Sequence, residues 1–98
     1  MQTLERIGKM EAALNACHRA TEALGARLDD MDALKDDMTA LFSYYGSAAW
    51  YADREAPLPE GVGAGVLSED LVYDEITAVR EAAIHMLELA TDILKNRL

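Results

Sequence analysis

The chain has 98 residues, of which 51% are hydrophobic and only six are Gly and two Pro, a size and composition typical of one folded domain. Eighteen acidic residues against nine basic ones give a formal net charge of -9 at pH 7. The basic residues are scattered, whereas nucleic acids and anionic membranes require clustered cations, so both partner classes are excluded. Charged residues also interrupt every apolar run before the roughly 18 residues that a membrane span needs.

A single cysteine, Cys17, cannot form a disulfide within the chain, and no secretory signal pattern is present at the N-terminus. We therefore expect a cytoplasmic protein. A chain of this length leaves about a third of its unfolded surface exposed after folding. The sequence thus favours self-association or binding to another protein.

The first half of the chain has the spacing of one long helical segment, from about residue 3 to residue 45, that ends at Gly46. Gly25 and the pair Asp29-Asp30 mark a candidate break within it. The residues of this first apolar seam recur at alternating spacings of three and four: Ile7, Met10, Leu14, Cys17, Thr21, Leu24, Leu28, Met31, Lys35, Met38, Phe42 and Tyr45.

Three further segments follow Gly46. Ser47 is suited to cap a short helix over about 48–54, and residues 55–66 carry the prolines and glycines of a loop. Ser68 then begins a C-terminal helix over about 68–96, because Glu69 and Asp70 suit the positive end of a helix dipole. This helix has a second apolar seam, formed by Val72, Ile76, Val79, Ala83, Met86, Ala90 and Ile93.

These segments predict an all-α fold in one domain, residues 1–98. It would be a long helical hairpin or a small up-down helix bundle, with the short helix and the Pro/Gly loop between the two long helical segments. The first segment is longer than the last, and two explanations stay open. Either the first helix breaks near 25–30 and gives a three- or four-helix bundle, or its overhang pairs with another subunit.

The aromatic residues gather at one end of the chain, since five of the six fall within residues 42–51. Tyr and Trp combine an apolar body with a polar tip, which suits a ligand pocket or a partner surface. The same residues would also fill a corner where two helices and a loop meet. Nine residues form the candidate ligand or partner surface: Tyr44, Tyr45, Ser47, Trp50, Asp53, Ser68, Asp70, Tyr73 and Arg80.

Other patterns that resemble chemical sites lack the required context, so we expect no catalytic residue, no metal site and no cofactor. Cys17 occupies an apolar seam position, where a thiol acts as a small hydrophobe. Three groups lack the spacing or context of metal or phosphate sites: the stripe Glu81, His85, Glu88 and Asp92, the acidic run Asp29, Asp30, Asp32, Asp36 and Asp37, and the glycines of 61–65.

The string Tyr44-Tyr45-Gly46-Ser47, followed by Trp50 and Asp53, resembles an uncharacterised bacterial family known as domain of unknown function 4298. The likeness continues through Gly65-Val66-Leu67-Ser68-Glu69-Asp70, Tyr73, Arg80 and Met86-Leu87-Glu88, and so covers most of the chain. The resemblance implies a short cytoplasmic helical protein with a long first helix. Residues 54–64 depart from the pattern, and Ala64 stands where members often have a basic residue.

Three functional hypotheses follow. The leading one is an acidic helical module for protein–protein interaction or self-association. The rival is a small-ligand-binding protein or enzyme, with a pocket between the Tyr-Tyr-Gly-Ser turn and the last helix. The third is a regulatory or immunity-type inhibitor that covers a cationic active site by charge complementarity. The residues favour a protein that is not an enzyme, and whether a small ligand binds stays open.

Overall fold

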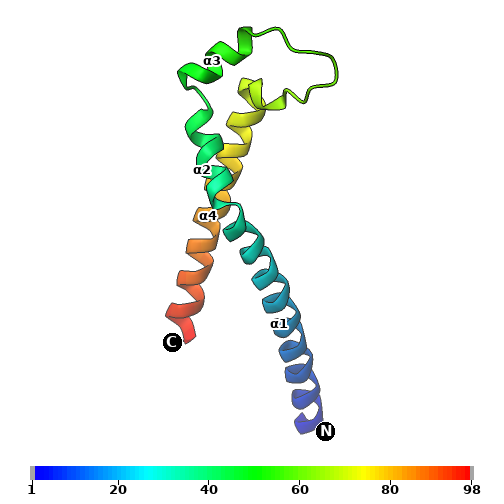
Figure 1. The fold of residues 1–98 in the computed structure, drawn as a ribbon. Coiled ribbons are helices and arrows are strands. Elements are labelled where there is room, and N and C mark those ends of the chain that lie inside the picture. The colour runs from blue at the N-terminus through cyan, green and yellow to red at the C-terminus, as the bar shows by residue number, and fades with distance from the viewer. Residues whose placement is uncertain (1, 98) are drawn as a thin grey trace. The chain divides into compact units, whose positions relative to one another are not determined.

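The computed structural model describes residues 2–97, and over that range the chain contains helices and no strand (Figure 1). In chain order the elements are α1 (Gln2–Ala33), α2 (Lys35–Tyr44), α3 (Ala48–Glu55), the short 3-10 helix η1 (Gly65–Leu67) and α4 (Glu69–Arg97). The predicted all-α class is confirmed. The chain divides into two compact units, one up to residue 39 and the other from residue 40.

Helix α1 forms most of the first unit and continues past both features proposed as a break. Gly25 lies within the helix, because a single glycine costs a helix interior only about 1 kcal/mol relative to alanine. The interruption comes instead at Leu34, whose N–H donates to the Met31 carbonyl at 3.1 Å in a tighter turn. Helix α2 then begins at Lys35. The candidate break near 25–30 is therefore absent, and the helix is interrupted at Leu34 instead.

Gly46 ends α2 as the sequence predicts. Its φ of +78° lies in the left-handed region, which glycine adopts without steric cost. The Ser47 N–H donates to the Tyr44 carbonyl at 2.9 Å and closes the turn. The Ser47 hydroxyl then accepts from the Trp50 N–H at 3.2 Å, so that one residue ends the turn and caps α3.

The segment between α3 and α4 is shorter than the expected loop over 55–66. Helix α3 includes Glu55, and residues 65–67 form η1, where the Ser68 N–H donates to the Gly65 carbonyl at 3.0 Å. The remaining residues, 56–64, follow the extended path that Figure 1 shows between α3 and η1. Helix α3 ends before Pro57, since a residue that precedes proline is disfavoured in the helical region.

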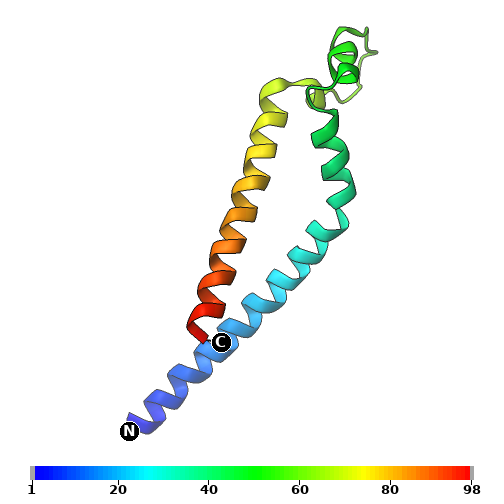
Figure 2. The same cartoon turned by 90° about the vertical axis from the view of Figure 1, so that its left-hand side faces the viewer.

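Helix α4 begins after Ser68, whose hydroxyl accepts from the Leu71 N–H at 3.3 Å. Glu69 and Asp70 occupy its first turn, where carboxylates are stabilised by the helix dipole. The helix is drawn in full in Figure 2, from its yellow beginning to its red end. By helical periodicity five of its seven acidic residues share the side opposite the second apolar seam: Asp70, Asp74, Glu81, Glu88 and Asp92.

The buried core is small. Among the side chains that the structure describes, only Trp50 and Val72 are buried, with 2% and 5% of their surfaces exposed. On α4, Ile76 and Val79 are partly buried, whereas every residue from 80 to 96 is exposed. No residue of 2–33 is buried either. Most residues of the two apolar seams are thus exposed.

No helix within residues 2–97 combines the length and the apolar character that a membrane span requires.

The role of Gly46 gives the first testable prediction. Gly46→Ala forces a side chain into the left-handed region, so we expect it to destabilise the unit that begins at residue 40 by about 1 kcal/mol. Trp50 fluorescence during thermal unfolding measures this change. Gly8→Ala is the control, because a Cβ there meets no atom within 4 Å, and it should leave the Trp50 transition in place. Equal midpoints for Gly46→Ala and the unmodified chain would contradict the assignment.

Candidate functional site

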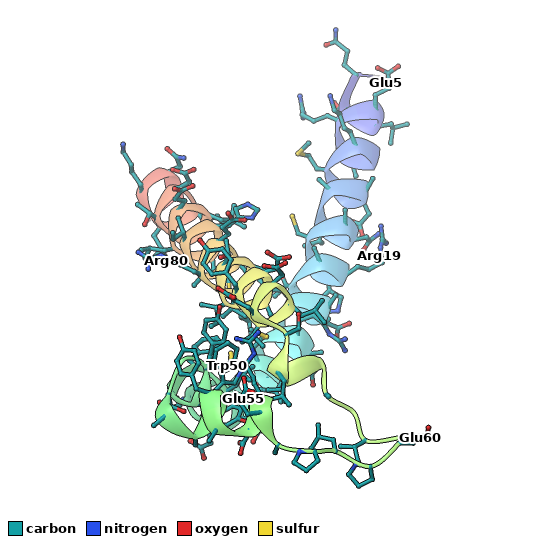
Figure 3. All side chains as sticks on the ribbon, turned by 90° about the horizontal axis from the view of Figure 1, so that it is seen from above. Glu5, Arg19, Trp50, Glu55, Glu60 and Arg80 are labelled. Atoms are coloured by element: carbon teal, nitrogen blue, oxygen red, sulfur yellow. The ribbon has the colours of Figure 1, made fainter. Side chains whose placement is uncertain are left out.

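Trp50 lies at the centre of the aromatic group, which we call the aromatic corner and define as Tyr44, Tyr45, Trp50 and Tyr51. Its indole is packed edge-on against Tyr45 and Tyr51, each with a ring-centroid distance of 5.0 Å. The Trp50 Nε1–H donates to the Val66 carbonyl at 2.9 Å, which ties α3 to η1. Figure 3 shows Trp50 between α3 and the beginning of α4.

Arg54 covers another part of Trp50. Its guanidinium carbon lies 4.7 Å from the indole centroid, which is a cation–π geometry. The two residues are four apart on α3, the spacing at which side chains on one helix face meet. This contact encloses the ring further and places a positive charge on the corner.

Tyr45 connects the end of α2 with the start of α4. Its hydroxyl donates to the Glu69 carbonyl at 3.1 Å, across 24 positions of sequence. Desolvation raises the pKa of Tyr45 above its ordinary value, and the negative charge that Glu69, Tyr51, Asp70 or Tyr73 can carry raises it further. The neutral phenol is therefore the form that this hydrogen bond requires and that the surroundings favour.

Tyr44 makes a separate contact with α3. Its hydroxyl donates to Asp53 Oδ2 at 2.6 Å, the length of a charge-assisted hydrogen bond. That hydrogen bond raises the pKa of Tyr44, with smaller contributions from desolvation and from the Asp53 charge. Asp53 and Tyr44 thus hold α3 against the end of α2.

Most of the nine predicted surface residues lie in or near this corner, but much of their polar capacity is used within the chain. The hydroxyls of Ser47 and Ser68 cap helices, and Trp50 is enclosed. Asp70 and Tyr73 lie close enough to act on the Tyr45 pKa, and Tyr73 is 61% exposed. Arg80 is exposed and begins about 16 Å along α4 from Glu69, so it stands apart from the corner.

Sequence reasoning missed three participants in the corner. Arg54 has a detectable signal, since it stands four residues after Trp50 on a predicted helix. Tyr51 is adjacent to Trp50, but its packing on the ring depends on the geometry of the corner. The Val66 carbonyl gives no sequence signal, because any residue supplies a carbonyl and the path of 56–64 decides which one meets the indole.

Each of the two exposed seams forms a further candidate surface. We define the α1 stripe as Leu4, Ile7, Met10, Leu14, Leu24 and Leu28, and the outer α4 stripe as Met86, Leu87, Ile93 and Leu94. All ten side chains are at least two-fifths exposed, and Leu14 and Leu87 reach 61% and 68%. Cys17, which the sequence places in a buried seam, is exposed beside them. Both stripes can take part in helix packing without any change of backbone.

The part of the chain that the structure describes contains no cluster of side chains arranged to bind a metal ion. No three His, Cys, Asp or Glu side chains among residues 2–97 converge as metal ligands would. His18 and Glu22 are in contact on α1, with 3.3 Å between His18 Nε2 and Glu22 Oε1. Both side chains are exposed, and their i,i+4 spacing is the ordinary one for neighbours on a helix surface.

The corner generates a prediction about stability. Trp50→Phe removes the donor to the Val66 carbonyl and part of the packed volume, so the free energy of unfolding should fall by about 2 kcal/mol. Urea unfolding followed by circular dichroism at 222 nm measures it, since the variant lacks tryptophan fluorescence. Tyr51→Phe is the matched control, and its exposed hydroxyl should matter by less than about 0.5 kcal/mol. An unchanged midpoint for Trp50→Phe would rule out the proposed role of the indole.

The Tyr44 contact generates a prediction about pH. Because the folded-state pKa of Tyr44 is raised, the contact stabilises the fold below the ordinary tyrosine pKa and is lost as the pH rises through the raised value. Asp53→Ala should return the Tyr44 pKa toward its ordinary range. Carbon-13 NMR of the labelled tyrosine rings measures the titration, with Glu60→Ala in the loop as the control. If Asp53→Ala leaves the Tyr44 titration where it was, the hydrogen bond does not set the pKa.

Comparison with known proteins gives one match. A family model described as Domain of unknown function (DUF4298) matches residues 7–89, which confirms the resemblance drawn from the Tyr-Tyr-Gly-Ser turn and the start of the last helix. No curated protein and no solved structure matches the chain.

Proposed function

We propose that this chain, which belongs to the family described as Domain of unknown function (DUF4298), is a cytoplasmic protein–protein interaction module. Its partner covers the apolar side chains of the α1 stripe and the outer α4 stripe. The proposal is carried by one observation: two long amphipathic helices present these side chains while only two residues of the described chain are buried. Exposed apolar surfaces of this extent mark interaction sites.

The energetic gain from covering a stripe is large on the scale of protein stability. Burial of one Leu, Ile or Met side chain contributes about 1.5–3 kcal/mol, so the six residues of the α1 stripe together contribute on the order of 10 kcal/mol. Ordering and association costs reduce this amount. Before these costs, the gain is comparable to the 5–15 kcal/mol by which a typical domain is stable. Association would therefore support both folding and recognition.

The charge distribution fits such a module. On α4 five of the seven acidic residues lie opposite the apolar seam, so a partner can pack on the seam while these carboxylates stay in water. The net charge of -9 opposes indiscriminate aggregation of chains that carry uncovered apolar side chains. A specific contact must therefore offset this repulsion through good packing.

The aromatic corner gives less support to a ligand-binding function. The Trp50 indole N–H, the Tyr45 hydroxyl and the Tyr44 hydroxyl all donate to groups of the same chain. A ligand that needs a donor from one of these three groups would have to replace an existing hydrogen bond. The corner is better suited to fix the direction in which α4 leaves the loop.

The proposal predicts that a charge on a stripe abolishes complex formation. Leu14→Asp and Leu87→Asp place a carboxylate at the contact, whereas Ala12→Asp places it elsewhere on the α1 surface and serves as the control. Light scattering across a dilution series measures the mass, and cross-linking in cell extract followed by mass spectrometry finds any other protein bound at fixed stoichiometry. A chain that stays monomeric and has no stripe-dependent protein partner contradicts the function.

A further inference from the structure

We infer that the α1 stripe binds the same stripe of a second copy of this chain, in a parallel, in-register, two-stranded coiled coil. The inference rests on the proposed function and names the partner of one of its two surfaces. It is drawn from residues 2–33 alone, which form an uninterrupted helix about 48 Å long.

The α1 sequence has the repeat that a coiled coil requires. Counting heptads from Ile7, apolar or small residues occupy the two seam positions, a and d, through four consecutive repeats. A strict seven-residue repeat keeps a seam in contact with a partner only when two helices supercoil around each other. The a positions are Ile7, Leu14, Thr21 and Leu28, and the d positions are Met10, Cys17, Leu24 and Met31.

The charges that flank the seam select the orientation. In a parallel, in-register pair, each g residue faces the e residue five positions later on the other helix. Arg6 then faces Glu11 of the partner subunit, and Arg27 faces Asp32 of the partner subunit. The other two g positions are alanines, so no like charges meet. Each contact occurs twice in the dimer, which gives four attractive pairs.

An antiparallel pair over the same four heptads is less favourable. There e positions face e positions, and Glu11 would lie opposite Asp32 of the partner subunit. The seam would also be mismatched, since Thr21 would meet Cys17 of the partner subunit. In the parallel pair each of these residues meets its own equivalent, and the two Thr21 hydroxyls can hydrogen-bond across the seam. One polar layer of this kind specifies register.

The competing occupant, α4 of a second copy, has a less suitable charge. Residues 2–33 carry four basic and six acidic residues, a net charge of -2, whereas α4 carries three basic and seven acidic residues, a net charge of -4. Pairing α1 with α1 therefore joins the two less charged helices. The ion pair that Arg27 makes on its own helix, with Asp30 at 3.3 Å, is exposed and weak, so it does not prevent the contact.

Cys17 is a native reporter of this arrangement, because two d residues of a parallel pair face each other at a separation that a disulfide can bridge. Mild oxidation of the full chain should give a disulfide-linked dimer that Cys17→Ser cannot form. On that background, Met10→Cys and Leu24→Cys should each link to themselves. Linkage of Met10→Cys to a chain with Leu28→Cys, in place of self-linkage, would show an antiparallel pair and overturn the inference.

Charge exchange provides the second measurement. Arg27→Glu places like charges at two contacts of the dimer and should raise its dissociation constant about 10-fold. Adding Asp32→Arg to the same chain restores the opposite charges of the parallel register and should recover most of the loss, whereas in an antiparallel pair Arg27→Glu alone would face Arg6 of the partner subunit and would not weaken the dimer. Sedimentation equilibrium under reducing conditions measures both. If the double variant is as weak as Arg27→Glu alone, the register is wrong.

The two proposals fail in different ways. A monomer at every concentration, together with a stripe-dependent complex with another protein, overturns the α1 pair and retains the interaction module. A monomer without any such partner overturns both. A dimer of about twice 10.7 kDa in which neither Met10→Cys nor Leu24→Cys forms a disulfide with its own equivalent overturns only the parallel register.

Discussion

The uncovered apolar side of α1 is the constraint on which the account depends. A helix of 32 residues with no buried side chain has little to offset the loss of backbone entropy, because most helical stability in proteins comes from packing of an amphipathic face. Its interior includes two glycines, which weaken it further. The repeat of Ile7, Leu14 and Leu28 with Met10 and Leu24 supplies a face that a second helix can cover. Under the proposed association, partner binding and the stability of α1 form one coupled equilibrium.

The aromatic corner stabilises the unit that begins at residue 40. The end of α2, helix α3 and the start of α4 meet there with almost no buried core. Hydrogen bonds from the side chains of Tyr44, Tyr45 and Trp50 hold these elements together, and the edge-on rings exclude water around Trp50. The corner thereby fixes the direction of α4 and leaves its outer stripe available for contact.

The sequence predicted those features that depend on neighbouring residues. Gly46, Ser47 and Ser68 act locally, so the end of α2 and the starts of α3 and α4 were predicted within a residue or two. The break at Leu34 was missed because glycine and paired aspartates weaken a helix without ending it. The contact of Trp50 with the Val66 carbonyl was missed because the path of 56–64 has no periodic signal. Periodicity also identifies an apolar face but not what covers it, which is why the sequence left open whether the seams pair within one chain or with another subunit.

Hydrogen exchange of the α1 backbone amides at several protein concentrations tests the central claim most directly. If a second chain supports α1, amides near Leu14 and Leu24 should be protected at high concentration and exchange quickly on dilution, while the Trp50 amide keeps its protection. Protection of α1 that stays constant over the whole dilution series would show that the helix is stable in a single chain, and would contradict the account.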